Sequence, residues 1–217
     1  MNFKGAIFDL DGVIVDTVPL HFEAWKRMFS EYGKNFTFDD YKVKVDGIPR
    51  LDGARAILTD LNGEELQKAA SKKQGYYLEL IDKVKIKIYY STLDLVKELK
   101  QNGIKVAAAS SSRNCRLILE RTNLAGLFDA IVGGSDFKKG KPDPEIFLLS
   151  ASNLGLSADE VIVFEDAILG VEAAKNGRML CVGIAREGDL RLLKKADIVV
   201  KDLSEVDYAK LKGLFKT

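Results

Sequence analysis

The first apolar run of the chain is short and ends in two aspartates. Residues 3–8 are almost continuously apolar, which is typical of a strand buried in a parallel sheet. Asp9 would then lie at the carboxyl end of this strand, and Asp11 would lie in the loop that follows it. Open parallel sheets bind ligands at this edge, so the pattern places candidate chemistry near the start of the chain.

Residues 18–88 have a helical pattern that differs from the rest of the chain. Apolar side chains recur three and four positions apart in two stretches. These are Phe22, Trp25, Met28, Phe29 and Tyr32 in the first stretch, and Leu66, Ala69, Ala70, Tyr77, Leu80 and Ile81 in the second. Because no alternating run lies between them, we expect an all-helical block.

From Ser91 onward helices and strands alternate. We predict strands at residues 104–109, 128–132, 161–164, 179–184 and 198–200, and a closing helix near 206–215. The spacing of Ser91 and Asp94 resembles a capping box at the start of the first helix. The pattern predicts an α/β domain with a parallel sheet, interrupted after its first strand. We assign residues 1–15 and 91–217 to the α/β core and residues 16–90 to an inserted helical cap that acts as a lid.

The composition is that of a balanced globular chain. With 217 residues, of which 47% are apolar, the chain can bury a full core. Its 33 lysines and arginines against 32 acidic residues give no reason to expect nucleic acid or an anionic membrane as the principal partner. No apolar run has the length of a signal sequence or a membrane span. We therefore expect a cytoplasmic protein, with Cys115 and Cys181 reduced.

Asp9 and Asp11 are one residue apart and precede a glycine, Gly12, that lets backbone N–H groups approach an anion. This arrangement suits covalent phosphoryl transfer with Mg²⁺, in which Asp9 is the nucleophile. A plain Asp-Gly turn after a strand is the alternative. Glu165 and Asp166 end a later strand in the same way, so the sequence predicts a Mg²⁺ site formed by Asp9, the Asp11 carbonyl and Asp166, with Glu165 assisting.

Two further loops at predicted strand ends carry candidate phosphate ligands. Ser110, Ser111 and Asn114 belong to a hydroxyl-rich segment that opens a helix, which suits a phosphate seat, although serines are also ordinary helix caps. Lys141 precedes a proline that favours an extended backbone, and Asp143 can cap a helix beginning at Pro144. A lysine held in this way can place its ammonium beside a transferring phosphoryl group.

Three cap residues are candidates for substrate contact. Lys73 falls on the apolar stripe of its helix, where an inward ammonium requires an anion; snorkelling past the rim of the core is the alternative. Arg50 follows a turn at residues 46–49 and can present its planar fork to a phosphate or carboxylate. His21, the only histidine, lies one turn before Trp25 and is either a packing partner of that ring or a proton-transfer group.

These residues together resemble the haloacid dehalogenase superfamily across nearly the whole chain. The four motifs that carry the resemblance are Asp9-Leu10-Asp11-Gly12-Val13, Ser110, Lys141-Pro142-Asp143-Pro144 and Glu165-Asp166. Within the superfamily the chain looks most like the β-phosphoglucomutase family. That likeness rests on Asp16-Thr17, His21-Phe22-Glu23-Ala24-Trp25, Arg50 and Lys73.

The resemblance implies a helical cap on a Rossmann-like core, bound Mg²⁺ and an aspartyl-phosphate on Asp9. It also implies that Asp11 is the general acid and base, and that Thr17 and His21 delay hydrolysis of the intermediate. The implied substrate is a small phosphorylated sugar, with a sugar bisphosphate as a candidate phosphodonor, and we expect a monomer. The chain departs from the family at Pro49, where the resemblance implies serine, and at Tyr90-Ser91, where Pro-Gly is common. A sugar-phosphate mutase, a sugar phosphatase and a catalytically silent binding module therefore remain alternatives.

Overall fold

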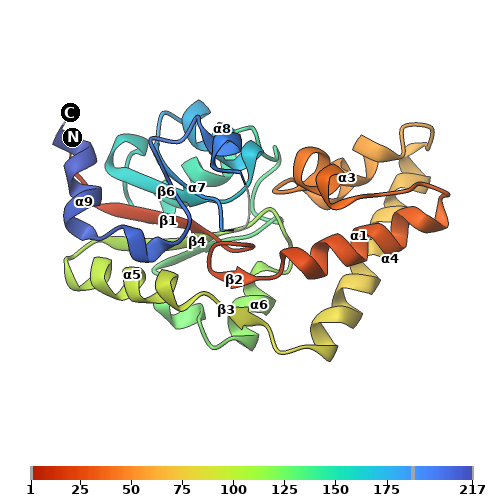
Figure 1. The fold of residues 1–217 in the computed structure, drawn as a ribbon, viewed down its shortest axis with the longest axis horizontal. Coiled ribbons are helices and arrows are strands. Elements are labelled where there is room, and N and C mark those ends of the chain that lie inside the picture. The colour runs from red at the N-terminus through yellow and green to blue at the C-terminus, as the bar shows by residue number, and fades with distance from the viewer. Residues whose placement is uncertain (1, 187–188, 217) are drawn as a thin grey trace.

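Six parallel strands form the centre of the larger part of the molecule (Figure 1). The structure, a computed structural model, describes residues 2–186 and 189–216. The strands are β1 (Gly5–Asp9), β4 (Lys105–Ala109), β5 (Ala130–Val132), β6 (Val161–Glu165), β7 (Leu180–Ile184) and β8 (Ile198–Val200). Their order is β5-β4-β1-β6-β7-β8, which confirms the predicted α/β fold class. The strands that follow β1 in the chain, β4 and β5, lie on one side of it, and the later strands lie on the other side. The carboxyl end of β1 therefore lies at the topological switch point of the sheet.

Side chains of the strands alternate between two separate hydrophobic clusters. Ala6 and Phe8 face the cluster that contains α5 (Tyr90–Gln101) and α6 (Cys115–Arg121). Ile7 faces the opposite cluster. That second cluster is covered by α7 (Glu145–Asn153) and α8 (Ile168–Asn176), so the sheet has helices on both faces, as Figure 1 shows. Burial on both faces explains why the strands read as continuous apolar runs.

The inserted cap is a helical unit with its own apolar core. It contains α1 (Val18–Glu31), α2 (Phe38–Asp40), a π-helical turn (Tyr41–Val45), α3 (Arg50–Ile57) and α4 (Gly63–Lys83). Aromatic rings fill the space between the helices; Trp25, for example, stacks on Phe29 with ring centroids 5.1 Å apart. Asn62 and Glu65 form a capping box at the start of α4, and its predicted apolar stripe is buried except for the half-buried Leu80, which confirms the helical pattern.

Two short strands join the cap to the core. β2 (Val15–Asp16) pairs in antiparallel fashion with β3 (Lys87–Ile88), so the two connections run side by side. The expectation that residues 18–88 are entirely helical is therefore wrong at β3. Two-residue strands are specified by their partner rather than by a local pattern, because a run this short shows no periodicity.

Other predicted details of the core also differ. The capping box at Ser91 is wrong, because α5 begins at Tyr90 and the Ser91 hydroxyl donates instead to Oδ2 of Asp202 at 2.9 Å. The helix after Lys141 starts at Glu145, with Pro144 at the capping position, and the Lys141–Pro142 peptide is cis. The closing helix, α9 (Tyr208–Gly213), is shorter than predicted.

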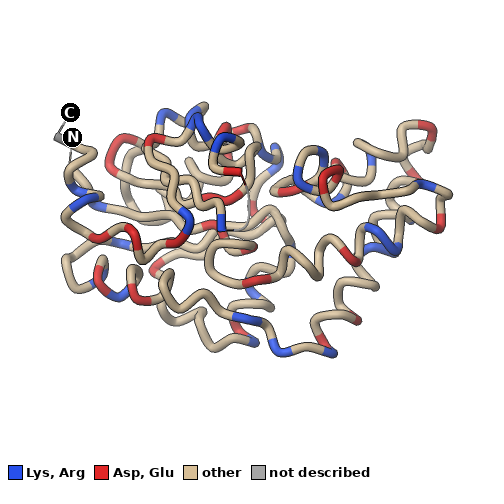
Figure 2. Tube along the Cα trace, viewed as in Figure 1, with Lys and Arg blue, Asp and Glu red and all other residues tan. Residues whose placement is uncertain are grey.

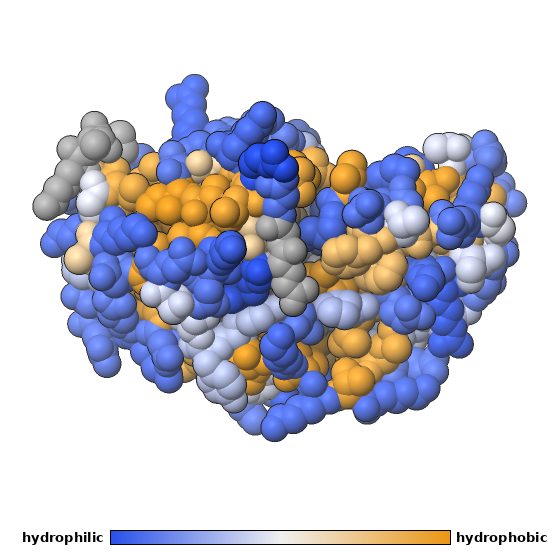
Figure 3. Space-filling model, viewed as in Figure 1, coloured by the Kyte–Doolittle hydropathy of each residue, from blue (hydrophilic) through white to orange (hydrophobic). Residues whose placement is uncertain are grey.

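The surface agrees with the balanced composition. Figure 2 shows basic and acidic positions interspersed over core and cap. In Figure 3 an apolar area lies on the core, whereas hydrophilic side chains dominate the outer end of the cap. Cys115 and Cys181 are buried free thiols, which confirms the prediction of reduced cysteines. No helix in the described ranges is long and apolar enough to cross a membrane.

Candidate active site

Neighbouring strands bring Asp9 and Glu165 to the same edge of the sheet. β1 and β6 are adjacent and parallel, with Phe8 opposite Phe164, so the carboxylates that follow lie side by side. Lys141 joins them: its Nζ lies 2.6 Å from Oδ1 of Asp9 and forms a second ion pair with Oε1 of Glu165. The Lys141 side chain is fully buried, so both ion pairs are shielded from water.

This edge carries more negative than positive charge. Burial raises the pKa of Asp9 well above its ordinary value; Lys141 opposes the shift, while Glu165, Asp11 and Asp166 add to it. Burial likewise raises the pKa of Asp166 to about 7. Burial would lower the pKa of Lys141, but Asp9 and Glu165 outweigh it and raise that pKa. A divalent cation at this edge would relieve the repulsion among the carboxylates.

Asp11 is held by three side chains from different parts of the chain. Thr17 donates a hydrogen bond to Oδ1, and Ser110 donates to Oδ2 at 2.8 Å. Nε2 of His21 lies 3.2 Å from Oδ1, although not in line for a full hydrogen bond. Burial favours the neutral acid, but His21 and the hydroxyl donors outweigh it, so the pKa of Asp11 falls below its ordinary value. Asp11 is therefore ionised and able to accept a proton.

Lys73 continues this network from the cap. Its Nζ lies 2.7 Å from Nδ1 of His21 and within 5.0 Å of the ring centroids of Trp25 and Tyr77. The side chain is buried, so it points inward and does not snorkel. Burial, and secondly Arg50, lower the pKa of Lys73 to about 7. An ammonium that donates to Nδ1 leaves the imidazole proton on Nε2, facing Asp11.

His21 therefore faces Asp11 and Lys73, and it does not pack on Trp25 as one of the two alternatives expected. Its ring stacks on Tyr77 with centroids 4.1 Å apart, rather than on the tryptophan one turn away. Burial and the charge of Lys73 lower the pKa of His21 below its ordinary value. The ring is thus a neutral link between the cap lysine and the core carboxylate.

Arg50 and Asn114 meet at another part of the pocket through a residue that the sequence did not single out. Arg50 donates to Oε1 of Gln74, and Nε2 of Gln74 donates to Oδ1 of Asn114 at 2.7 Å. Burial, and then Arg113, lower the pKa of Arg50. Neither arginine forms an ion pair with a carboxylate among residues 2–186 and 189–216, so two guanidinium groups face the pocket without a neutralising partner.

Ser111 and Gly12 each lie where two segments of the chain approach each other closely. The Ser111 hydroxyl donates to the carbonyl of Gly47 in the cap at 2.7 Å, so it ties cap to core here. Gly12 has φ of 86°, and a Cβ at this position would lie 2.3 Å from Oδ2 of Asp166. Only glycine allows this backbone conformation together with such a close carboxylate.

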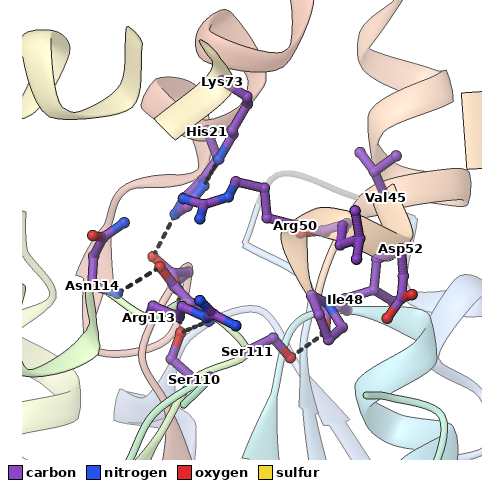
Figure 4. A pocket seen from close by; sticks show the side chains of 18 of the residues that line it. His21, Val45, Ile48, Arg50, Asp52, Lys73, Ser110, Ser111, Arg113 and Asn114 are labelled. Carbon is purple, nitrogen blue, oxygen red and sulfur yellow. Dashed lines mark hydrogen bonds and ion pairs between the residues drawn. The ribbon is translucent and has the colours of Figure 1, made fainter. Parts of the chain in front are cut away.

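A pocket of about 290 Å³ lies between cap and core. Its walls include Asp9, Asp11, Lys73 and Arg50. Figure 4 shows Arg50 extending from the cap across the pocket towards His21 and Asn114, with Ser110 and Ser111 below. The structure therefore brings the predicted core and cap residues to one cavity. Thr17, Gly12 and Lys141 adjoin it through their contacts with Asp11, Asp166 and Asp9.

The predicted metal ligands lie at this edge but are unequally available. Within the described ranges no group of three or more His, Cys, Asp or Glu side chains is arranged to hold a metal ion. Glu165 is committed, because Lys141 pairs with Oε1 and the N–H of Ala167 donates to Oε2 at 2.7 Å. Asp9 is engaged in the same way, by Lys141 at Oδ1 and by the N–H of Asp11 at Oδ2, so among the described residues Asp166 is the least committed of the three carboxylates. This suits Mg²⁺, which binds through one or two protein carboxylates together with water and phosphate oxygens.

Four residues near the site were missed by the sequence analysis. They are Lys42, Asp46, Gln74 and Arg113. Arg113 and Gln74 directly adjoin predicted residues, Asn114 and Lys73, so adjacency was an available signal. Lys42 and Asp46 are four positions apart, but their placement depends on how the cap packs on the core.

Comparisons with known proteins agree with the resemblance noted in the sequence. The family profile "haloacid dehalogenase-like hydrolase" matches residues 6–184. A β-phosphoglucomutase of Bacillus subtilis is 36% identical over 211 residues, covering 94% of this chain and 91% of its own. A phosphorylated carbohydrates phosphatase of Thermotoga maritima is 35% identical, covering 80% and 81%. The crystal structure of a β-phosphoglucomutase from Clostridium difficile superimposes with a TM-score of 0.90 at 31% identity, covering 99% of this chain and 97% of its own.

Proposed function

Because the chain belongs to the haloacid dehalogenase-like hydrolase family, we propose that it transfers phosphoryl groups through an aspartyl-phosphate on Asp9, as a β-phosphoglucomutase-like sugar-phosphate mutase. The substrate would be a small phosphorylated sugar. The observation that carries the proposal is the pair of guanidinium groups, Arg50 and Arg113, which face the same pocket as Asp9 and have no carboxylate partner in the described part of the chain.

The core residues would carry out the transfer itself. In one half-reaction a sugar hydroxyl attacks the phosphoryl group on Asp9, the bond from phosphorus to Asp9 breaks, and the ionised Asp11 takes up the hydroxyl proton. In the other half-reaction an oxygen of Asp9 attacks phosphorus, the bond from phosphorus to the sugar oxygen breaks, and Asp11 returns the proton to that oxygen. Lys141, fixed between Asp9 and Glu165, would stabilise the charge on the transferring group.

Mg²⁺ would be held by Asp9, the Asp11 carbonyl and Asp166, with Glu165 beside it. When bound, it would neutralise phosphate charge and orient the phosphate oxygens. Gly12 keeps Asp166 close to the loop that carries Asp11, which favours a compact oxygen site. The serines after β4 and Asn114 would line the phosphate path, in keeping with their place in the pocket.

The cap residues favour a mutase over a simple hydrolase. A mutase must hold its intermediate away from water while a bisphosphate changes orientation. Arg50, Arg113 and Lys73 would bind the phosphate that is not being transferred. Thr17, Ser110 and His21 occupy the oxygens of Asp11, so this carboxylate is poorly placed to activate water when no sugar is present.

A sugar phosphatase is the second candidate. It is supported by the phosphatase relative, whose identity to this chain nearly equals that of the mutase relative. The proline at position 49, beside Arg50, also distinguishes the cap loop from the family pattern. A phosphatase would use the same core groups but would admit water to the aspartyl-phosphate.

One assay separates the two. The protein is incubated with Mg²⁺ and hexose monophosphates, with and without a catalytic sugar bisphosphate, and isomerised sugar and free phosphate are measured together. We expect isomerisation that depends on the bisphosphate and exceeds phosphate release. Phosphate release without isomerisation on any hexose phosphate would overturn the mutase proposal in favour of a phosphatase.

A further inference from the structure

Lys42 reaches from the cap to the core carboxylate Asp166. It lies on the π-helical turn Tyr41–Val45, and its Nζ is 3.4 Å from Oδ2 of Asp166. The same ammonium pairs with Asp46, one helical turn further along the cap. The side chains of Asp166 and Asp46 are only 13% and 6% exposed, so water screens these charges weakly.

The oxygen that Lys42 approaches belongs to Asp166, the least committed of the three carboxylates at this edge. The same oxygen packs closest to Gly12, on the side where the Asp11 loop runs. An ammonium and a divalent cation repel each other when they share one carboxylate, because their separation is only a few ångströms. Each therefore weakens the hold of the other on Asp166.

Asp46 gives Lys42 an alternative partner. Because Lys42 already contacts Asp46, it can leave Asp166 without becoming an unpaired buried charge. The cost of losing the contact with Asp166 is thereby limited, and the contact becomes reversible. Without Asp46, an ammonium in this position would have Asp166 as its sole carboxylate among the residues that the structure describes.

We propose that Lys42 is a positioning residue that competes with Mg²⁺ for Asp166, and that metal binding leaves its ammonium paired with Asp46. The proposal rests on the proposed function in one respect, namely that Asp166 is a metal ligand. Its consequence is that metal binding breaks an ion pair between cap and core. Mg²⁺ and the position of the cap are therefore thermodynamically linked.

The first test is calorimetric titration of the full-length protein with MgCl₂, comparing the parent with Lys42→Met and Lys44→Met. Lys44 is a matched control, because it lies on the same turn and loses the same charge but pairs with Asp40 at 2.6 Å. We expect Lys42→Met to bind Mg²⁺ roughly three- to tenfold more tightly, as for the loss of one competing ion pair. Lys44→Met should match the parent.

The second test is a double-mutant cycle with Asp46→Asn. In the parent background this substitution removes the alternative partner, so Mg²⁺ should bind more weakly. In the Lys42→Met background the effect should be smaller, because no ammonium remains to be redirected. Equal effects in both backgrounds would overturn the proposal.

The outcomes distinguish this proposal from the proposed function. If the parent binds Mg²⁺ and Lys42→Met binds it equally or more weakly, the competition is overturned while the metal site stands. If the parent does not bind Mg²⁺ and Asp166→Asn leaves the calorimetric trace unchanged, the metal site and the competition both fall. Tighter binding in Lys42→Met alone, with the Lys44→Met control unchanged, supports the competition.

Discussion

Each oxygen of Asp9 has a different neighbour. Oδ2 accepts a hydrogen bond from the N–H of Asp11 at 2.9 Å, and Oδ1 faces Lys141. We predict that Asp9→Asn abolishes turnover, because an amide cannot attack phosphorus and is a poor metal ligand. The fold should persist, since Lys141 keeps its ion pair with Glu165. Turnover and the thermal unfolding midpoint are measured together; activity within about tenfold of the parent would contradict the nucleophile role.

Lys73 gives a prediction about pH and stability. Its pKa is about 7 in the folded protein, against an ordinary value of 10.5. Below pH 7 both states hold the proton and the folded protein bears the full cost of the buried charge. As pH rises from about 7 to about 10 the folded state sheds the proton while the unfolded state keeps it, so the parent gains up to about 1.4 kcal/mol per pH unit. Lys73→Met lacks this gain.

The measurement is the free energy of unfolding in denaturant across this pH range. The stability of Lys73→Met relative to the parent should be greatest near pH 7 and should decline as pH rises. Lys72→Met is the control, because Lys72 is exposed and pairs with Glu31 at 2.6 Å. The difference in unfolding free energy between Lys72→Met and the parent should be constant over about pH 7–9. If the difference in unfolding free energy between Lys73→Met and the parent is also independent of pH, burial of the Lys73 charge does not destabilise the folded protein.

At the scale of elements, a glycine in the interior of the long helix α4 lowers its stability. Gly75 lies in its interior, exposed, and an added Cβ would meet nothing within 4 Å. Gly75→Ala should stabilise the protein by about 0.8–1 kcal/mol, because alanine loses less backbone entropy in a helix. Gly63→Ala, at the first residue of the helix, should have a smaller effect. Denaturant unfolding measures both; destabilisation by Gly75→Ala would contradict the argument.

A second element-scale prediction concerns the contact between the cap loop and the core loop. A Cβ on Gly140 would lie 2.2 Å from Cδ of Pro49. Gly140→Ala should therefore hold the cap away from the core and lower sugar-phosphate turnover by roughly tenfold, as for an overpacked contact. Steady-state kinetics with a sugar phosphate measure this.

The control is the double variant Gly140→Ala with Pro49→Ala. Removing the proline ring frees the space that the new methyl group needs, so turnover should recover relative to Gly140→Ala alone. If the loss came from disturbing the neighbouring Lys141 instead, the second substitution would restore nothing. Equal activity of the single and double variants would therefore contradict the cap-contact explanation.

The elements predicted correctly from the sequence are those with a continuous apolar run or a long periodic pattern. β1 and β6 read as continuous apolar runs because both faces of the sheet are covered, and α4 shows its stripe over 21 residues. β2 and β3 were missed because two residues carry no periodicity, and their pairing joins positions far apart in the chain. The π-helical turn was also missed, because the conformation of its five residues is determined by packing in the cap rather than by a local pattern.

For the molecule as a whole, the predictability of the site divides between core and cap. Asp9 and Glu165 follow predicted parallel strands, and the carboxyl ends of such strands meet at one edge, so their meeting could be predicted. Lys42 and Arg113 could not be assigned, because their roles depend on how the cap packs on the core. Ser111 was expected at a phosphate, yet its hydroxyl bonds to Gly47 across the same interface.

The last prediction tests whether cap and core act together as a mutase. Arg50 extends from α3 into the pocket, whereas Arg55, on the same helix, is exposed and pairs with Asp52. Removing the Arg50 guanidinium should cost a charge-assisted hydrogen bond of about 1.5–3 kcal/mol to the distal phosphate, and thus lower sugar-phosphate turnover by about tenfold or more. Arg55→Ala should match the parent.

The ratio of isomerised sugar to released phosphate identifies the cause. Arg50→Ala should lower this ratio, because a poorly closed cap lets water reach the aspartyl-phosphate more often. Phosphorylation of Asp9 by a small donor such as acetyl phosphate should continue, since that transfer needs only the core groups. If Arg50→Ala keeps the ratio and the turnover of the parent, the guanidinium does not bind the distal phosphate. If labelling of Asp9 is lost instead, Arg50 acts on the core chemistry and not through closure of the cap.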